Sequence, residues 1–186
     1  EDLVAVDERL LSEHRRQGAP RVLGLDVAEH AVEYAVATGA LDAGSAENLE
    51  DADPSPRLSA LLSDVDLITT TGGVGYVTDR TFRRLLAATP KAPWVAAFCL
   101  RTYDYGPIAE TLGEHGLRTE RTARTFPQRR FADAAEKRWA VAEVTARGLD
   151  PAGKEAEDYY HAEFYLSRPA EEVAERPLDV LLPDLC

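Results

Sequence analysis

The chain of 186 residues carries 33 acidic and 21 basic side chains, which gives a formal net charge of −12. This length allows one domain with a sizeable core, and the negative charge argues against nucleic acid or an anionic membrane as the main partner, since both need a positive face. The sequence has no long apolar run, no signal-peptide pattern and no metal-ligand spacing at Cys99 or Cys186, so we expect a reduced, cytoplasmic protein without a membrane span.

The N-terminal part is predicted to hold an amphipathic helix, a buried strand and a second helix. The first helix covers residues 2–17, and the strand covers residues 22–25 and ends on Asp26. The second helix ends at Gly39, because glycine adopts the left-handed C′ conformation without steric cost. Two interpretations of Asp26 stay open. It caps the helix, or its carboxylate accepts hydrogen bonds from both hydroxyls of a ribose above the strand end.

A second short strand and its exit loop are predicted over residues 44–49. Glu47 and Asn48 would lie at the rim of the same crevice, where an acid or an amide can bind the amino group of an adenine. The alternative is a solvated loop. A turn follows over residues 51–56, and then comes a short helix whose buried side chains are expected to be Leu58, Leu61 and Leu62.

The next predicted strand, residues 65–69, runs directly into a glycine cluster, Thr70-Thr71-Gly72-Gly73-Val74-Gly75-Tyr76. Glycines after a buried strand let the backbone approach a ligand or make a tight turn. The cluster matches neither the P-loop nor the GxGxxG spacing, and no lysine follows it. A helix capped by Asp79 comes next.

Two further strands are predicted in the middle of the chain. The first covers residues 94–100, and Arg101, Tyr103 and Tyr105 follow at the presumed ligand edge. A helix then begins at Pro107 and ends at Gly116, and the second strand covers residues 117–122.

The C-terminal third is predicted to hold one helix and one strand. Residues 126–131 are expected to form a solvated basic connection with Arg129 and Arg130. The helix covers about residues 132–147 and would bury Trp139, Val141 and Val144, and the alternating segment 159–167 is a last strand. Residues 169–186 are expected to be a C-terminal tail.

Alternating strands and helices indicate an α/β fold. Five segments, GLDVAEHAVEYA, VDLITTTGGVGY, WVAAFCL, LRTERT and HAEFYLS, follow one another in an order that resembles the class I S-adenosylmethionine-dependent methyltransferases, over roughly residues 21–168. The resemblance implies a Rossmann-like, doubly wound, mostly parallel sheet with an antiparallel C-terminal strand, forming a single domain over residues 1–168.

The resemblance also implies a cofactor, S-adenosylmethionine, and a small-molecule acceptor. The candidate cofactor-binding residues are Asp26, Val27, Glu47, Asn48, Leu49, Thr71, Gly72 and Gly73. The candidate substrate-binding residues are Tyr76, Arg101 and Tyr103, and the candidate catalytic residues are Tyr105 and His161. The methyl transfer would be an in-line displacement, which needs a base only when the acceptor is protonated. A homodimer is left open, and no metal site is expected because the histidines stand in no ligand motif.

One part of the family pattern is missing from the chain, namely the first strand and its glycine-rich loop, which should precede Asp26. That strand lies mid-sheet in the family, and a sheet without it leaves two rows of backbone groups unpaired. We therefore expect the native protein to have a further N-terminal segment.

Two alternatives compete with a methyltransferase. DLITTTGGVGYVTD resembles the TTGGTG…D signature of molybdopterin-binding proteins of cofactor biosynthesis, although Val74 replaces the threonine and the spacing to Asp79 is imprecise. The second alternative is a non-catalytic binding module with a methyltransferase-like fold, since fold alone does not fix function.

Overall fold

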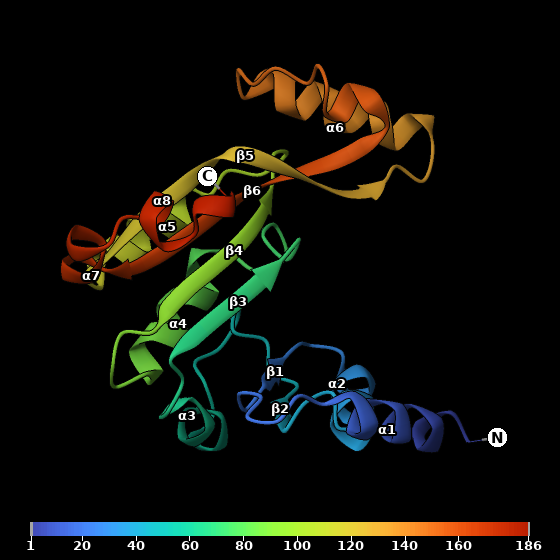
Figure 1. Ribbon diagram of the computed structural model, residues 1–186, viewed down its shortest axis with the longest axis vertical. Coiled ribbons are helices and arrows are strands. Elements are labelled where there is room, and N and C mark those ends of the chain that lie inside the picture. Colours follow the sequence, from blue (N-terminus) through green and yellow to red (C-terminus); the bar gives the residue numbers. More distant parts are fainter. Residues whose placement is uncertain (1, 186) are drawn as a thin grey trace. The chain divides into compact units, whose positions relative to one another are not determined.

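The structure is a computed structural model that describes residues 2–185 (Figure 1). Its chain divides into two compact units, Glu1–Leu62 and Ser63–Cys186, which we call unit 1 and unit 2. Each unit has its own strands and helices. The single domain expected over residues 1–168 stays a prediction.

Unit 1 is a small α/β unit built on one pair of parallel strands. Strands β1 and β2 pair in register from Leu23 opposite Ala43 to Leu25 opposite Ser45. The close packing of α2 requires a glycine in β2, because a Cβ built at Gly44 would lie 2.4 Å from the Val32 side chain. The elements of unit 1 are α1 (Leu3–His14), β1 (Leu23–Leu25), α2 (Glu29–Ala37), β2 (Ala43–Ser45) and α3 (Pro56–Leu62).

Unit 2 is built on a four-stranded mixed sheet with the strand order β3-β4-β6-β5. Its strands are β3 (Leu67–Thr71), β4 (Trp94–Leu100), β5 (Leu117–Arg130) and β6 (Tyr159–Pro169). Strands β3 and β4 are parallel, whereas β6 lies between β4 and β5 and runs antiparallel to both. The antiparallel C-terminal strand is therefore confirmed. The expectation of a mostly parallel sheet is wrong for unit 2, because the insertion of β6 makes two of its three strand pairs antiparallel.

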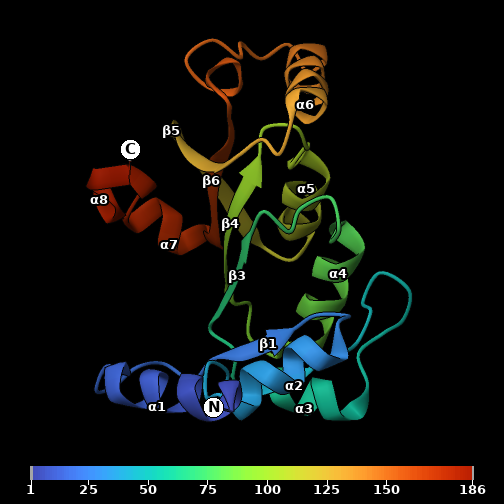
Figure 2. The ribbon, with the colours of Figure 1, turned by 90° about the vertical axis from the view of Figure 1, so that its right-hand side faces the viewer.

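Alternating side chains of β4 face two different layers of helices. Val95, Ala97 and Cys99 are buried in one cluster with Phe82 of α4 and Ile108 of α5. The intervening residues, Trp94, Ala96 and Phe98, contact a second cluster that includes Leu178 of α8. In Figure 2 the sheet of unit 2 accordingly lies between α4 and α5 on one face and α7 and α8 on the other. The helices are α4 (Asp79–Ala88), α5 (Gly106–Glu114), α6 (Ala134–Ala146), α7 (Ala170–Glu175) and α8 (Leu178–Leu181), with 3₁₀ turns at Glu155–Glu157 (η1) and Pro183–Leu185 (η2).

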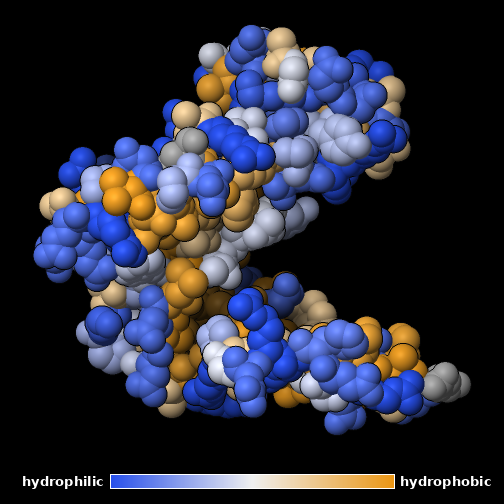
Figure 3. Space-filling model, viewed as in Figure 1, coloured by the Kyte–Doolittle hydropathy of each residue, from blue (hydrophilic) through white to orange (hydrophobic). Residues whose placement is uncertain are grey.

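The segment expected to be a C-terminal tail forms two short helices that pack on the sheet. Helices α7 and α8 contact β5 and β6, and the second cluster is completed by partly buried Leu181, Leu182 and Leu185. Figure 3 shows hydrophobic side chains over α8 and β4, where this layer covers the sheet only in part. The apolar residues of LDVLLPDL thus pack against β6, a contact that the acidic composition of this segment alone does not indicate.

Two expectations about the region around α6 are wrong. The segment 126–131 is not a connection, because residues up to Arg130 belong to β5 and pair with β6, although Arg129 and Arg130 are exposed to solvent as expected. Trp139 is not buried but 44% exposed, because α6 buries Ala140 and Val144 on its inner side. Both errors concern residues that line the candidate site.

Two further observations concern membrane-spanning helices and the cysteines. No helix within residues 2–185 is both long and apolar enough to cross a membrane. Cys99 is a free, buried thiol, and burial raises its pKa to about 12. Cys186 lies outside the described residues.

Candidate functional site

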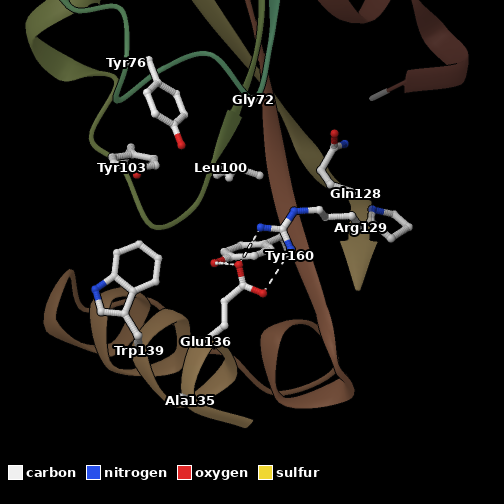
Figure 4. A pocket seen from close by; sticks show the side chains of 11 residues that line it. Gly72, Tyr76, Leu100, Tyr103, Gln128, Arg129, Ala135, Glu136, Trp139 and Tyr160 are labelled. Carbon is white, nitrogen blue, oxygen red and sulfur yellow. Dashed lines mark hydrogen bonds and ion pairs between the residues drawn. The ribbon is translucent and has the colours of Figure 1, made fainter. Parts of the chain in front are cut away.

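A cavity of about 860 Å³ lies in unit 2 near the ends of β3 and β4. Because these strands are parallel, their carboxyl ends at Thr71 and Leu100 meet at one edge of the sheet. We call the space the strand-end cavity, and Figure 4 shows the side chains that line it. They are Gly72, Tyr76, Leu100, Tyr103, Pro127, Gln128, Arg129, Ala135, Glu136, Trp139 and Tyr160.

The glycine cluster forms the loop wall of the strand-end cavity. Gly72 donates its N–H to the carbonyl of Phe98 at 3.0 Å, which extends the pairing of β3 with β4, and its φ of +67° turns the chain at the strand end. Gly75 has a φ of +109°, and a Cβ built there would lie 2.6 Å from the Tyr103 ring. Glycine at position 75 therefore allows Tyr103 to lie directly against the loop.

An ion pair between β5 and α6 forms the opposite wall. The Arg129 guanidinium donates to both carboxylate oxygens of Glu136, at 2.5 and 3.0 Å, and lies 4.9 Å from the centre of the Tyr160 ring. Glu136 also accepts from the Ala132 N–H at 2.5 Å and from the Tyr160 hydroxyl at 3.2 Å. These donors, the guanidinium above all, lower the pKa of Glu136 to about 2. The carboxylate is therefore ionised and held rigidly in place.

Aromatic side chains supply most of the remaining lining. Tyr160 is buried, whereas Tyr76 is 84% exposed and Trp139 is 44% exposed. Within residues 2–185, the hydroxyls of Tyr76 and Tyr103 and the indole N–H of Trp139 have no hydrogen-bond partner. Figure 4 shows the rings of Tyr76, Tyr103 and Trp139 on one side of the cavity and Arg129 over Tyr160 on the other. The cavity can thus offer donors and ring faces to a ligand.

Three candidate cofactor residues, Thr71, Gly72 and Gly73, belong to the loop wall, and Gly72 lines the cavity. The other five belong to unit 1. Asp26 is exposed, and only its Oδ1 is engaged, by the Ala28 N–H at 2.9 Å. Asp26 does not cap the helix, because the N-cap of α2 is Ala28 and no side chain caps it; the Asp26 carboxylate instead closes the turn before the helix, and its other oxygen has no partner in the described part of the chain.

The second group of unit 1 candidates is more fully engaged. Glu47 accepts from the Ser45 hydroxyl at 2.6 Å and from the Ser55 N–H at 2.8 Å, and these bonds lower its pKa. Asn48 donates to Asp51 and accepts from the Glu50 N–H. Leu49 is buried and Val27 is exposed. The Glu47 carboxylate thus stabilises its own loop, and a role for it in adenine binding stays a prediction.

Arg101, a candidate substrate residue, is buried away from the strand-end cavity. Its guanidinium donates to Glu155 at 2.6 Å and to the carbonyl of Asp150 at 2.9 Å. Burial raises the pKa of Glu155, in spite of the guanidinium beside it. Arg147 adds hydrogen bonds to the carbonyls of Arg101 and Tyr103. Arg101 therefore connects the end of β4 to η1 and does not line the cavity.

The two candidate catalytic residues do not line the strand-end cavity either. Tyr105 is buried, and its ring stacks on Tyr165 with centroids 4.2 Å apart; burial raises the pKa of its hydroxyl. His161 lies on β6 with Nδ1 3.2 Å from the Thr125 hydroxyl, and burial lowers its pKa. Of the five candidate substrate and catalytic residues, the structure brings only Tyr76 and Tyr103 together at the cavity.

Sequence reasoning missed the wall formed by Gln128, Arg129, Glu136 and Tyr160. One signal was present, because Tyr160 shares the inward phase of its strand with Ala162 and Phe164, which are also buried. Arg129 and Glu136 gave no comparable signal. Their contact depends on the way the chain returns from β5 into α6, and side chains seven residues apart meet only if that turn is known.

Comparison with known proteins assigns no family. No family model matches the chain, and no curated protein matches it. Among solved structures, the crystal structure of the [4+2]-cyclase SpnF aligns with a TM-score of 0.44 and 11% sequence identity, over 89% of this chain and 81% of that one.

Proposed function

We propose that the protein transfers a methyl group from S-adenosylmethionine to a small-molecule acceptor that binds in the strand-end cavity. The observation that carries the proposal is the position of the cavity at the carboxyl ends of β3 and β4, with Gly72 in its wall. Ligands of open α/β sheets bind at such edges. The resemblance of VDLITTTGGVGY to the methyltransferases implies that the methionine moiety and the substrate bind near this loop. A Rossmann-like, doubly wound fold is part of the proposal.

The residues present fit the cofactor at two points, each considered within its own unit. In unit 1, the exposed carboxylate of Asp26 keeps one oxygen without a partner, as a ribose ligand requires. In unit 2, the loop from Thr71 to Gly73 has side chains small enough to let a ligand approach the backbone. When bound, S-adenosylmethionine supplies an electrophilic sulfonium methyl group.

The chain's own contribution would be to bind and orient the acceptor and to exclude water from it. Rings that line the strand-end cavity hold an apolar acceptor, and the free hydroxyls of Tyr76 and Tyr103 fix its orientation by hydrogen bonding. The carboxylate of Glu136 is too strongly hydrogen-bonded to accept a proton near neutral pH, since its pKa is about 2. A base is therefore supplied by another group, or the acceptor atom carries no proton when it reacts.

The test is a calorimetric titration of the protein with S-adenosylmethionine and S-adenosylhomocysteine. We expect binding of both, and loss of binding in Asp26→Ala. Asp26→Asn keeps an oxygen for the Ala28 N–H but removes the charge, so it separates the hydrogen bond of this turn from ribose binding. Glu29→Gln, an exposed acid at the start of α2, is the matched control and should bind normally. Absence of binding by the wild-type protein contradicts the proposal.

The two alternatives predict different results. A non-catalytic module binds the cofactor but transfers no methyl group to any acceptor that binds in the cavity. In a molybdopterin-binding protein the glycines after β3 and Asp79 would serve the pterin phosphate, and Arg129, the one cation among the described lining residues, is paired with Glu136. Binding of a pterin phosphate in preference to S-adenosylhomocysteine would favour that alternative. A cytoplasmic location and a homodimer stay predictions.

A further inference from the structure

We infer that the strand-end cavity selects acceptors that are electrically neutral, planar and aromatic, and that the Arg129–Glu136 pair sets this choice by excluding ions of either sign. This inference rests on the proposed function, since it names the class of acceptor for the same cavity. It follows from the charges, the rings and the free donors of the lining.

The charges of the cavity wall cancel. Among the described residues that line the cavity, only Arg129 and Glu136 carry a charge at neutral pH, and two hydrogen bonds join them. An anionic ligand that approaches Arg129 also approaches the carboxylate of Glu136, and a cation meets the guanidinium in the same way. Like charges placed side by side are costly in a partly desolvated site, so the pair penalises both kinds of ion.

The aromatic faces are also distributed unfavourably for a cation. The Arg129 guanidinium occupies the position over the Tyr160 ring, at 4.9 Å from its centre. The Tyr103 ring lies directly against Gly75, so the loop covers part of it. A cation would therefore find Tyr76 and Trp139 but not a complete aromatic cage, whereas a neutral ring can stack on the same surfaces without electrostatic cost.

The free polar groups of the cavity define the hydrogen bonding of the ligand. The indole N–H of Trp139 and the hydroxyls of Tyr76 and Tyr103 are available as donors within the described part of the chain. A ligand with carbonyl or hydroxyl oxygens on an aromatic ring satisfies them. A volume of about 860 Å³ accommodates such a molecule, since pockets for drug-sized ligands range from about 300 to 1,000 Å³.

The test uses three probes that share a naphthalene ring and differ in charge, namely naphthol, naphthoate and naphthyltrimethylammonium. Calorimetric titration of the whole protein near neutral pH should show that naphthol binds about tenfold more tightly than either ion. Cyclohexanol, which is neutral but not planar, should bind more weakly than naphthol. The inference is overturned if either ion binds as tightly as naphthol, or if naphthol does not bind.

Two variants then test the role of the ion pair. Glu136→Gln leaves Arg129 without its carboxylate, so naphthoate should gain about tenfold in affinity. Arg129→Gln leaves Glu136 without its guanidinium, so naphthyltrimethylammonium should gain instead. Lys137→Gln removes the neighbouring Lys137–Asp158 pair and should leave the order of the three probes unchanged. Unchanged selectivity in both folded variants would show that the pair does not set the choice.

The outcome separates this inference from the proposed function. Circular dichroism establishes that each variant is folded, and if one is not, the order of the probes on the wild-type protein decides the question. Binding of S-adenosylhomocysteine without the predicted order of probes leaves the function standing and overturns the acceptor class. If the probes bind in the predicted order but the cofactor does not bind, the acceptor class stands and the proposed function is overturned.

Discussion

Two Arg–Glu pairs of unit 2 have the same chemistry and opposite environments. Arg101 and Glu155 form a pair whose side chains are 4% and 1% exposed. Arg129 and Glu136 line the strand-end cavity with side chains that are 62% and 22% exposed. The first pair connects the end of β4 to η1, whereas the second forms a wall that a ligand can reach.

The two glutamates titrate in opposite directions because burial and hydrogen bonding compete. Burial raises the pKa of Glu155, since the loss of hydration has a larger effect than the attraction of the neighbouring guanidinium. The guanidinium and the Ala132 N–H lower the pKa of Glu136 to about 2, since their hydrogen bonds outweigh the loss of hydration at this carboxylate. Arg101–Glu155 is therefore a structural connection, whereas we propose that Arg129–Glu136 takes part in ligand selection.

The largest expected effect comes from breaking the buried pair. Arg101→Ala leaves the Glu155 carboxylate buried without its cation, so the free energy of unfolding should fall by about 3–5 kcal/mol. Urea denaturation measures it. The double variant Arg101→Met, Glu155→Leu removes both charges and should recover a large part of the loss. A cost below about 1 kcal/mol for the single variant would show that the pair is hydrated in solution.

Gly75→Ala should perturb the cavity wall and lower the free energy of unfolding by less than Arg101→Ala does. The new Cβ would lie 2.6 Å from the Tyr103 ring at a φ of +109°, so we expect a loss of about 1–3 kcal/mol in unfolding free energy and weaker binding of naphthol. Gly113→Ala is the control, because nothing lies within 4 Å of its Cβ position in α5. It should stabilise the protein by about 0.5–1 kcal/mol. Equal effects of the two variants would contradict the close contact of loop and ring.

Trp139→Ala separates binding from stability. Trp139 is 44% exposed and lines the strand-end cavity, so the free energy of unfolding should fall by only about 1–2 kcal/mol, for the buried part of the indole. The affinity for naphthol should fall about tenfold, because a stacking surface is lost. Val141→Ala, two residues further along α6 and so on a different side of the helix, is the comparison variant. Retained affinity in Trp139→Ala would remove the indole from the site.

The smallest effect is a pH dependence of stability caused by Glu136. Its pKa is lowered from 4.5 in the usual case to about 2 in the folded protein, so its contribution to stability is complete above pH 4.5 and is lost as the pH falls towards 2. The thermal midpoints of wild type and Glu136→Gln should therefore differ most above pH 4.5 and converge below it. A difference that grows on acidification has the wrong sign for this account.

The elements with strong local signals could be predicted from the sequence. The strand Trp94–Leu100 has the predicted bounds, because a β-branched and aromatic run follows Pro93 and ends before a polar cluster. The helix ending at Gly39 was also expected, and Gly39 has the predicted positive φ of 75°. The helix after the glycine cluster begins at Asp79, although Thr78 and not Asp79 provides its cap.

The rest depends on contacts between distant parts of the chain. Arg101 pairs with Glu155, 54 residues later, and no local pattern distinguishes such a buried arginine from one that binds a substrate. The sheet is mixed because β6 inserts between β4 and β5, which hydrophobic alternation does not reveal. At the site, Gly72 and Tyr76 of the loop wall and the neighbouring Tyr103 could be predicted from the sequence. The wall formed by Arg129 and Glu136 could be identified only from the structure.

The most direct test of the strand-end cavity as the acceptor site is the NMR signal of the tryptophan side chains during a titration with naphthol. The chain has two tryptophans, and the indole N–H of Trp94 donates to Glu172 at the other end of β4, about 20 Å from Leu100. We predict that the Trp139 signal, assigned with Trp139→Phe, shifts in a saturable manner while the Trp94 signal stays in place. A stationary Trp139 signal, or equal shifts of both, would contradict the account.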